Sequence, residues 1–142
     1  MEPTSHILRR FYTEVWEQGR LDAISGYFQP DTSSPILIED RAVEPYEVRE
    51  WMEILRGLVS HLKVTFIHTI DKDDWTAAFL KITCNCRRTN KPVAVYQQIM
   101  CRQNNGLLVE SYPLFDLLRF FEQLDQLPED AYALLMAGTR LR

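Results

Sequence analysis

The apolar residues of this chain repeat with a helical period up to about residue 59 and with a period of two from residue 62, and this change constrains the fold most. Residues 63–70 alternate along a predicted strand. Polar turns separate it from three further predicted strands, and one turn contains Asn105-Gly106, a favoured pair in tight hairpins. Those strands cover residues 75–87, 93–103 and 107–115. Together they predict a curved antiparallel meander.

Helical patterns lie on both sides of the predicted meander. Apolar residues from Ile7 to Trp16 recur at helical spacing, and Gly19 accepts the left-handed conformation that ends a helix. A second short helix is predicted to end at Pro30. A turn is then expected over residues 32–35, a short strand over 36–39, and helices over 45–59, 117–124 and 128–136. Helices against one face of an antiparallel sheet predict the α+β class.

Aromatic residues are placed where they would line a cavity between these layers. A bent sheet closed by helices leaves a conical cavity, which is a common ligand site. Tyr12 and Trp16 come from the first helix, Trp51 from the helix at 45–59, and Tyr112 from the last strand. Such rings would stack on a planar substrate, and the Tyr12 hydroxyl would donate a hydrogen bond to a developing enolate oxygen. Core packing is the alternative for all of them, and it is favoured for Trp51.

Two residues are candidates for proton transfer, each with a structural alternative. Asp116 follows the last strand, where a carboxylate at a pocket rim would take the acidic proton beside a carbonyl group. The same residue precedes an apolar helical run, so it is also a favoured N-cap. His68 alternates in phase with Val64 and Phe66, so on a concave face it would act as general base or donor. A hydrogen-bonded core or interface histidine is the alternative.

Two neighbouring glutamines compete for one position in the cavity. Gln97 and Gln98 face opposite sides of their predicted strand, so only one of them can line it. We count Gln98 among the ligand-binding candidates, together with Trp16, Trp51 and Tyr112. A glutamine there would orient a carbonyl group but would not move protons.

Composition and charge exclude several classes of function. With 142 residues, the chain is long enough for one domain with a core of its own. The formal charge of −4 argues against nucleic acid, which is bound by clustered Lys and Arg. No apolar run approaches the roughly 20 residues of a membrane span, and the first residues do not resemble a secretion signal. We therefore expect a cytoplasmic protein with no nucleic-acid or membrane partner.

The cysteines fit this expectation. Cys84 and Cys86 are two apart on a predicted strand, so their side chains point to the same side, a poor geometry for a disulfide. Together with Cys101 they are expected to be buried, reduced thiols. Only three scattered histidines could complement them as metal ligands, so neither a metal site nor a cofactor is expected.

Two segments resemble a known family. Residues 12–28, with Trp16, Gly19 and Tyr27-Phe28, followed by Pro30-Asp31, resemble the opening of the nuclear transport factor 2-like superfamily. Residues 109–116, continuing to Gln123-Leu124 and Leu127-Pro128, resemble its SnoaL-like polyketide cyclase branch. The resemblance spans essentially the whole chain. It implies a single SnoaL-like domain over residues 1–142, in which N-terminal helices wrap a curved sheet into a conical pocket, the cystatin-like roll.

The resemblance also implies roles for individual residues. Tyr12 stands seven residues before Gly19, as the proton-donating tyrosine of related steroid isomerases does, but Ser34 stands before Pro35 where those enzymes carry their general-base aspartate. Asp116 resembles the acid–base aspartate of SnoaL-type cyclases. The region of that aspartate's histidine partner holds Gln98, Met100 and Arg102 instead.

We therefore expect a small-molecule-binding protein. The ligand would be small, largely apolar and carbonyl-bearing, with cofactor-independent cyclase, isomerase or lyase chemistry performed by Asp116, His68 and Tyr12. A non-catalytic ligand-binding or protein-association module is the alternative. The resemblance, and the apolar residues on both faces of the strand at 75–87, also lead us to expect a homodimer through the outer face of the sheet.

Overall fold

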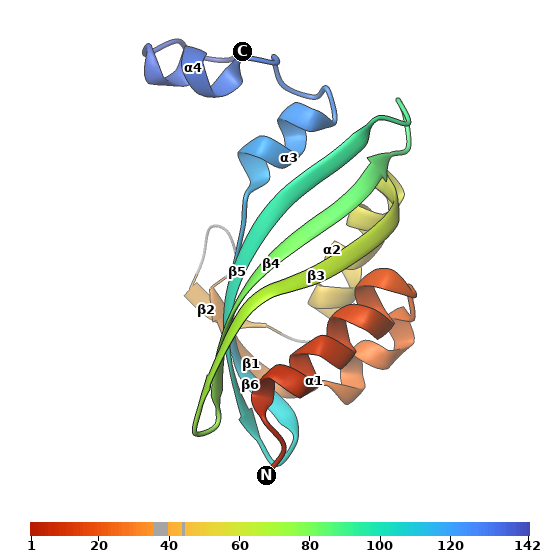
Figure 1. The fold of residues 1–142 in the computed structure, drawn as a ribbon, viewed down its shortest axis with the longest axis vertical. Helices are drawn as coiled ribbons and strands as arrows, with labels where there is room; N and C mark the ends of the chain where they lie inside the picture. The colour runs from red at the N-terminus through yellow and green to blue at the C-terminus, as the bar shows by residue number, and fades with distance from the viewer. Residues whose placement is uncertain (36–39, 44) are drawn as a thin grey trace.

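The computed structural model describes residues 1–35, 40–43 and 45–142, which form one curved sheet with helices against one of its faces (Figure 1). The described strands are β1 (Phe28–Pro35), β2 (Asp40–Val43), β3 (Val59–Lys72), β4 (Trp75–Cys86), β5 (Pro92–Asn104) and β6 (Leu107–Phe115). Their order is β2-β1-β6-β5-β4-β3, and every pair is antiparallel except β1 with β6. The predicted α+β class and the meander β3–β6 are confirmed. The strand predicted over residues 36–39 lies outside the described residues.

The helices lie at the two ends of the chain and between β2 and β3. They are α1 (Thr4–Phe11), the π-helical turn η1 (Tyr12–Glu17), the 3₁₀ turn η2 (Leu21–Gly26), α2 (Pro45–Leu58), α3 (Leu117–Gln123) and α4 (Ala131–Met136). Figure 1 shows α1 and α2 on the same side of the sheet, whereas α4 stands beyond its end. None of the described helices has the length and apolar character needed to cross a membrane.

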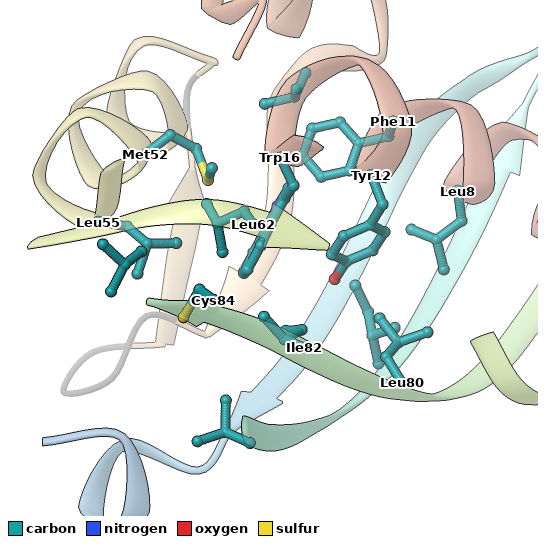
Figure 2. Close-up of a cluster of buried hydrophobic side chains, with 14 of the residues drawn as sticks. Leu8, Phe11, Tyr12, Trp16, Met52, Leu55, Leu62, Leu80, Ile82 and Cys84 are labelled. Atoms are coloured by element: carbon teal, nitrogen blue, oxygen red, sulfur yellow. The ribbon is translucent and has the colours of Figure 1, made fainter. Parts of the chain in front are cut away.

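The sheet has an inner face that forms the core and an outer face that no described helix covers. On β4 and β5 burial alternates strictly, and Leu80, Ile82 and Ile99 belong to the buried set. Figure 2 shows Leu80 and Ile82 facing Leu8 of α1 and Tyr12 of η1, and all four belong to the same core cluster. The outer face carries the alternate residues of the same strands, among them Phe79 and Tyr96, whose rings stack at 5.2 Å.

The short helix predicted up to Pro30 and the turn predicted over residues 32–35 are wrong. The helical segment already ends at Gly26, and residues 28–35 form β1. The Leu108 N–H donates to the Tyr27 carbonyl at 2.8 Å, which starts the pairing with β6. Pro30 lies where the β1–β6 register shifts, between Phe28 and Ser33, and such an irregularity tolerates a residue without an N–H.

A β-bulge in β3 overturns the predicted position of His68. Phe66 is opposite Leu80, but His68 is opposite Phe79, so Ile67 is an extra residue in the ladder. One inserted residue reverses the alternation of the strand beyond it. His68 therefore lies exposed on the outer face and does not share the inner face with Phe66.

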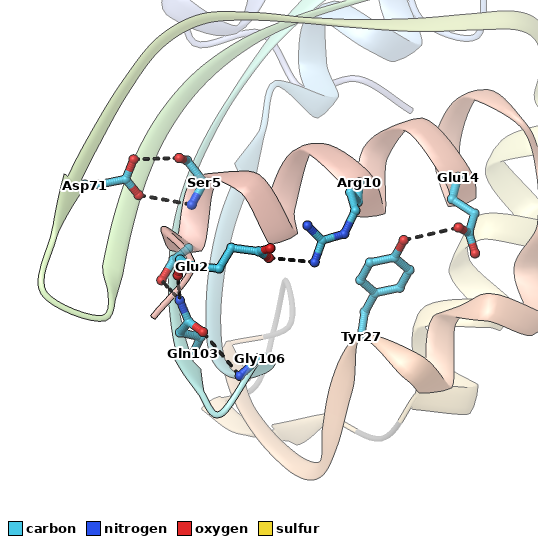
Figure 3. Close-up of polar contacts among 9 residues, drawn as sticks. Glu2, Ser5, Arg10, Glu14, Tyr27, Asp71, Gln103 and Gly106 are labelled. Atoms are coloured by element: carbon cyan, nitrogen blue, oxygen red, sulfur yellow. Dashed lines mark hydrogen bonds and ion pairs between the residues drawn. The ribbon is translucent and has the colours of Figure 1, made fainter.

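The first turn of α1 is capped by a residue that is distant in sequence. Pro3, at the N-cap position, offers no side-chain cap. Instead, the Asp71 carboxylate accepts hydrogen bonds from the Ser5 backbone N–H at 3.0 Å and from the Ser5 hydroxyl at 2.5 Å (Figure 3). Thr4 adds a hydrogen bond to the Asp74 carbonyl at 2.6 Å. These contacts fasten the start of α1 to the β3–β4 hairpin.

Replacing Asp71 with Asn is expected to lower the unfolding free energy at neutral pH by about 0.5–1 kcal/mol, because a charged cap at a helix N-terminus is lost. Partial burial raises the pKa of Asp71, but the hydrogen bonds from Ser5, with smaller contributions from Thr76 and His6, outweigh it and hold the pKa below its ordinary 3.8. The stabilisation is therefore complete above about pH 4 and is lost as the pH falls through the lowered pKa. Urea unfolding at pH 7 and pH 2.5 measures this difference.

Asp73→Asn is the matched control, since Asp73 lies two residues away in the exposed hairpin turn. It should leave the unfolding free energy unchanged at both pH values. An equal loss for both variants, or a loss for Asp71→Asn that persists at pH 2.5, would refute the capping role.

Candidate functional site

An aromatic cluster occupies the inside of the curved sheet. Its members come from five elements and comprise Tyr12, Trp16, Trp51, Phe66, Phe115 and Phe120. Trp16 lies at the centre, with ring centroids at 5.1 Å from Tyr12, 5.6 Å from Trp51 and 6.3 Å from Phe115. Trp51 and Phe115 are only half-buried, so the cluster is closed on the Tyr12 side and reaches solvent on the other.

The π-helical turn places two of these rings side by side. In η1 the Gln18 N–H donates to the Thr13 carbonyl, five residues back, at 3.0 Å. Short π-helical turns are rare and are frequently found at functional sites. From α2, the Arg56 guanidinium donates to the Trp16 carbonyl at 2.5 Å and so holds the end of this turn. Gly19 follows with a φ of +72°, which confirms the left-handed end predicted there.

Tyr12 and Gln97 form a buried polar pair within the cluster. The Tyr12 hydroxyl points from the helix towards the sheet (Figure 2) and donates to the Gln97 Oε1 at 2.7 Å. Burial raises the pKa of Tyr12 well above its ordinary value, so the phenol stays protonated and serves as a donor. The Gln97 Nε2 has no hydrogen-bond partner among the described residues. The pair therefore leaves one amide donor available inside an apolar surrounding.

The structure brings together three of the residues predicted for the site. Tyr12 and Trp16 are 2% and 3% exposed, and Trp51 contacts Trp16. Gln98 is not with them, because it is opposite Phe79 and Leu114 on the outer face. Gln97 takes the inner position instead.

Tyr112 also lies on the outer face, opposite Met100. Its ring stacks on Trp75 at 6.4 Å, and its hydroxyl donates to the Glu110 Oε1 at 2.7 Å. Glu110 in turn pairs with Arg102. Tyr112 therefore belongs to a polar and aromatic group on the outer surface, separate from the aromatic cluster.

Asp116 has the geometry of a helix cap. The residue is exposed, and its Oδ1 accepts from the Arg119 backbone N–H at 3.2 Å, at the start of α3. This is the capping geometry predicted for an aspartate that directly precedes an apolar helical run. The carboxylate is directed to its own helix rather than to a second converging polar group.

Local sequence patterns do not identify three aromatic residues of the cluster, or Gln97, as site residues. Phe66, Phe115 and Phe120 follow ordinary strand and helix periods, which do not separate a cavity wall from a core. Gln97 did carry a signal, since it alternates in phase with Val95 and Ile99.

Two hollows of the surface lie away from the aromatic cluster. One, of about 440 Å³, is bordered by His61, Asn85 and Gln123. The other, of about 490 Å³, lies beside α1 and is bordered by Arg10, Glu14 and Tyr27 (Figure 3). Neither hollow is bordered by a residue of the aromatic cluster.

The cysteines are buried thiols on the inner side of β4 and β5. Burial raises the pKa of Cys84 to about 11 and that of Cys101 to about 12, so both are protonated and unreactive at neutral pH. Within the described part of the chain, no group of three His, Cys, Asp or Glu side chains is arranged to hold a metal ion.

The chain matches a known protein family. The model of the SnoaL-like polyketide cyclases matches residues 6–124, which is most of the chain. No curated protein matches the chain.

Solved structures share the fold at low sequence identity. AclR from Streptomyces galilaeus, a candidate hydroxylase, has a TM-score of 0.75 at 18% identity, covering 95% of this chain and 92% of its own. A candidate polyketide cyclase from Acidithiobacillus ferrooxidans has a TM-score of 0.73 at 19% identity, and the alignment covers 87% of this chain and 94% of that protein. IdmH from Streptomyces antibioticus, another candidate polyketide cyclase, has a TM-score of 0.73 at 15% identity, and the alignment covers 87% of this chain and 99% of IdmH. At these identities the likeness shows the fold alone.

Proposed function

Because the chain belongs to the SnoaL-like polyketide cyclase family, we propose that it binds a small, largely apolar molecule through a carbonyl oxygen at the aromatic cluster. The observation that carries this proposal is the Gln97 amide. Tyr12 holds its oxygen at 2.7 Å, which orients the amide and leaves Nε2 to donate to a ligand. A few placed polar groups in an apolar lining are typical of ligand sites.

The half-buried edge of the cluster is the side from which a ligand would enter. Trp51 and Phe115 meet there edge to face, with ring centroids 6.2 Å apart. A planar ligand would replace the contact between these two rings and stack on Trp16 beneath them. The Gln97 amide would then fix the orientation of the ligand.

The polar groups of the interior favour binding over proton transfer. The buried polar side chain that contacts Tyr12 is the neutral amide of Gln97. A phenol with a raised pKa donates a hydrogen bond but does not accept a proton from carbon. Cyclase, isomerase or lyase chemistry with Asp116 as the base is the second form of the proposal, and it requires the cap on α3 to open.

Titration with 9-fluorenone, a planar aromatic ketone, and with fluorene, the same rings without the oxygen, tests the proposal. Quenching of the Trp16 and Trp51 fluorescence should show that fluorenone binds about tenfold more tightly, the value of one hydrogen bond. Gln97→Leu should remove this preference, whereas Gln98→Leu, on the opposite face, should keep it.

Gln97→Glu provides a second variant if Gln97→Leu does not fold. It keeps an oxygen for Tyr12 and removes the N–H donor, so it should also abolish the preference for the ketone. Equal affinity of the wild type for both compounds, no quenching by either, or equal effects at positions 97 and 98 would refute the proposal. Turnover of a bound ketone that is lost in Asp116→Asn would favour the catalytic form.

A further inference from the structure

We propose that the C-terminal arm, residues 125–142, docks on the outer face of the sheet in a second copy of this chain. The arm follows the part of the chain that matches the family, which ends at residue 124. Figure 1 shows its helix, α4, beyond the end of the sheet and away from α1 and α2. Few contacts join α4 to the other helices and strands.

One side of α4 is apolar and exposed. Tyr132, Leu135 and Met136 are 60%, 42% and 72% exposed. Their spacing of three and four residues places them along one stripe of the helix. Ala131 and Leu134 lie on another side, where they are buried and half-buried. The helix therefore already uses one side for its own chain and presents a second to an outside surface.

The start of the arm is held by hydrogen bonds and an ion pair to the β4–β5 hairpin, so the arm is oriented before it docks. The Arg88 guanidinium donates to the Leu124 carbonyl at 2.6 Å, and Lys91 pairs with Asp125 at 2.9 Å. The Gln123 amide donates to and accepts from the Ala94 backbone, at 2.9 Å in both directions. A segment that is already oriented loses less conformational entropy on binding.

The outer face of the sheet offers a matching surface. Tyr96, Met100 and Leu114 are 47%, 49% and 74% exposed on neighbouring strands. Phe79 stacks on Tyr96 and extends the patch to β4. Gln98 lies among these residues, opposite Phe79 and Leu114, so the apolar patch surrounds one exposed amide. Exposed apolar surface of this kind typically marks an interaction site.

Charge favours a second copy of the chain as the occupant. Glu129 and Asp130 lie at the start of α4, and Lys63 and Lys81 lie on the outer face. Lys81 is directly opposite Tyr96 in the ladder. Asp130, Lys63 and Lys81 form no ion pair with a described residue, whereas Glu129 interacts with Lys91 of its own chain. In a two-fold symmetric dimer the acidic start and apolar stripe of each arm would meet the basic and apolar patch of the partner, twice over.

Sedimentation velocity of the full chain at micromolar concentration tests the proposal. The wild type should sediment with twice the monomer mass of 16.7 kDa. Leu135→Asp combined with Met136→Asp should give the monomer, and Met100→Asp on the outer face should do the same. Ala133→Asp, exposed on a different side of α4, should remain dimeric.

Charge reversal supplies the second test. Asp130→Lys and Lys81→Asp should each weaken the dimer about tenfold, and their combination should restore it. A monomeric wild type would overturn the proposal. So would a dimer that survives the change at Leu135 and Met136, which would assign the interface to the sheet faces alone. Failure of the combined reversal to restore association would overturn the pairing of arm with face.

Discussion

Trp16→Ala is expected to lower the unfolding free energy by about 3–5 kcal/mol, the usual effect of removing a fully buried Trp. The indole is 3% exposed and contacts Tyr12, Trp51 and Phe115. Its removal takes away the centre of the aromatic cluster, and the surrounding strands cannot collapse onto the space. Urea unfolding followed by far-UV circular dichroism measures the loss.

Trp75→Ala is the matched control, because Trp75 is half-buried on the outer face. It loses its stacking on Tyr112 and its contact with the Arg102 guanidinium, 6.0 Å from the ring. The expected loss is less than half that of Trp16→Ala. Equal losses would show that the interior is no more closely packed than the outer surface, which would contradict the described core.

Tyr12→Phe is expected to lower the unfolding free energy by about 1–3 kcal/mol, because it leaves the oxygen of the buried Gln97 amide without its hydrogen-bond donor. Gln97→Leu should cost a similar amount by stranding the Tyr12 hydroxyl. The double variant should cost less than the two losses added together, since it leaves neither group unpaired. Burial raises the pKa of Tyr12, so this contribution should persist up to about pH 10 and be lost as the pH rises through the raised pKa.

Tyr46→Phe provides the comparison for the hydroxyl alone. Tyr46 is 61% exposed on α2, so its hydroxyl remains in water and its loss should leave stability unchanged. If the losses from Tyr12→Phe and Gln97→Leu simply add in the double variant, the two side chains are not coupled and the polar pair does not form.

The fold could be predicted from the sequence because its signals are local and repeated. The alternation of β4 and β5, the Asn105-Gly106 turn and the left-handed Gly19 each depend on neighbouring residues only. Pairing between β1 and β6 was not predictable in this way, because it is parallel and joins segments far apart in the chain. Local patterns alone therefore predict a helix up to Pro30.

The candidate site was predicted less completely, for a related reason. Tyr12, Trp16 and Trp51 were identified by residue type and helical spacing, and the structure brings them together. The alternation of residues 63–70 predicts the wrong face for His68, because the sequence pattern alone does not reveal a β-bulge. Gln97 and Gln98 face opposite sides of the strand. Which of the two is the inner residue depends on the face of the sheet that the helices cover, and the local sequence does not show this. For Asp116, the structure shows the cap that the following helix already indicated.

The bulge at Ile67 also determines where the first helix is anchored. Beyond the extra residue, β3 turns Thr69 and Asp71 towards the inner face, opposite Ala78 and Thr76. Only from this side does the Asp71 carboxylate reach Ser5. A deletion of one residue at this point would exchange the two faces of the hairpin end and move the carboxylate away from α1. One inserted residue, 62 positions after Ser5 in the chain, thus helps to fix the start of α1, the helix that leads directly into η1 with Tyr12 and Trp16.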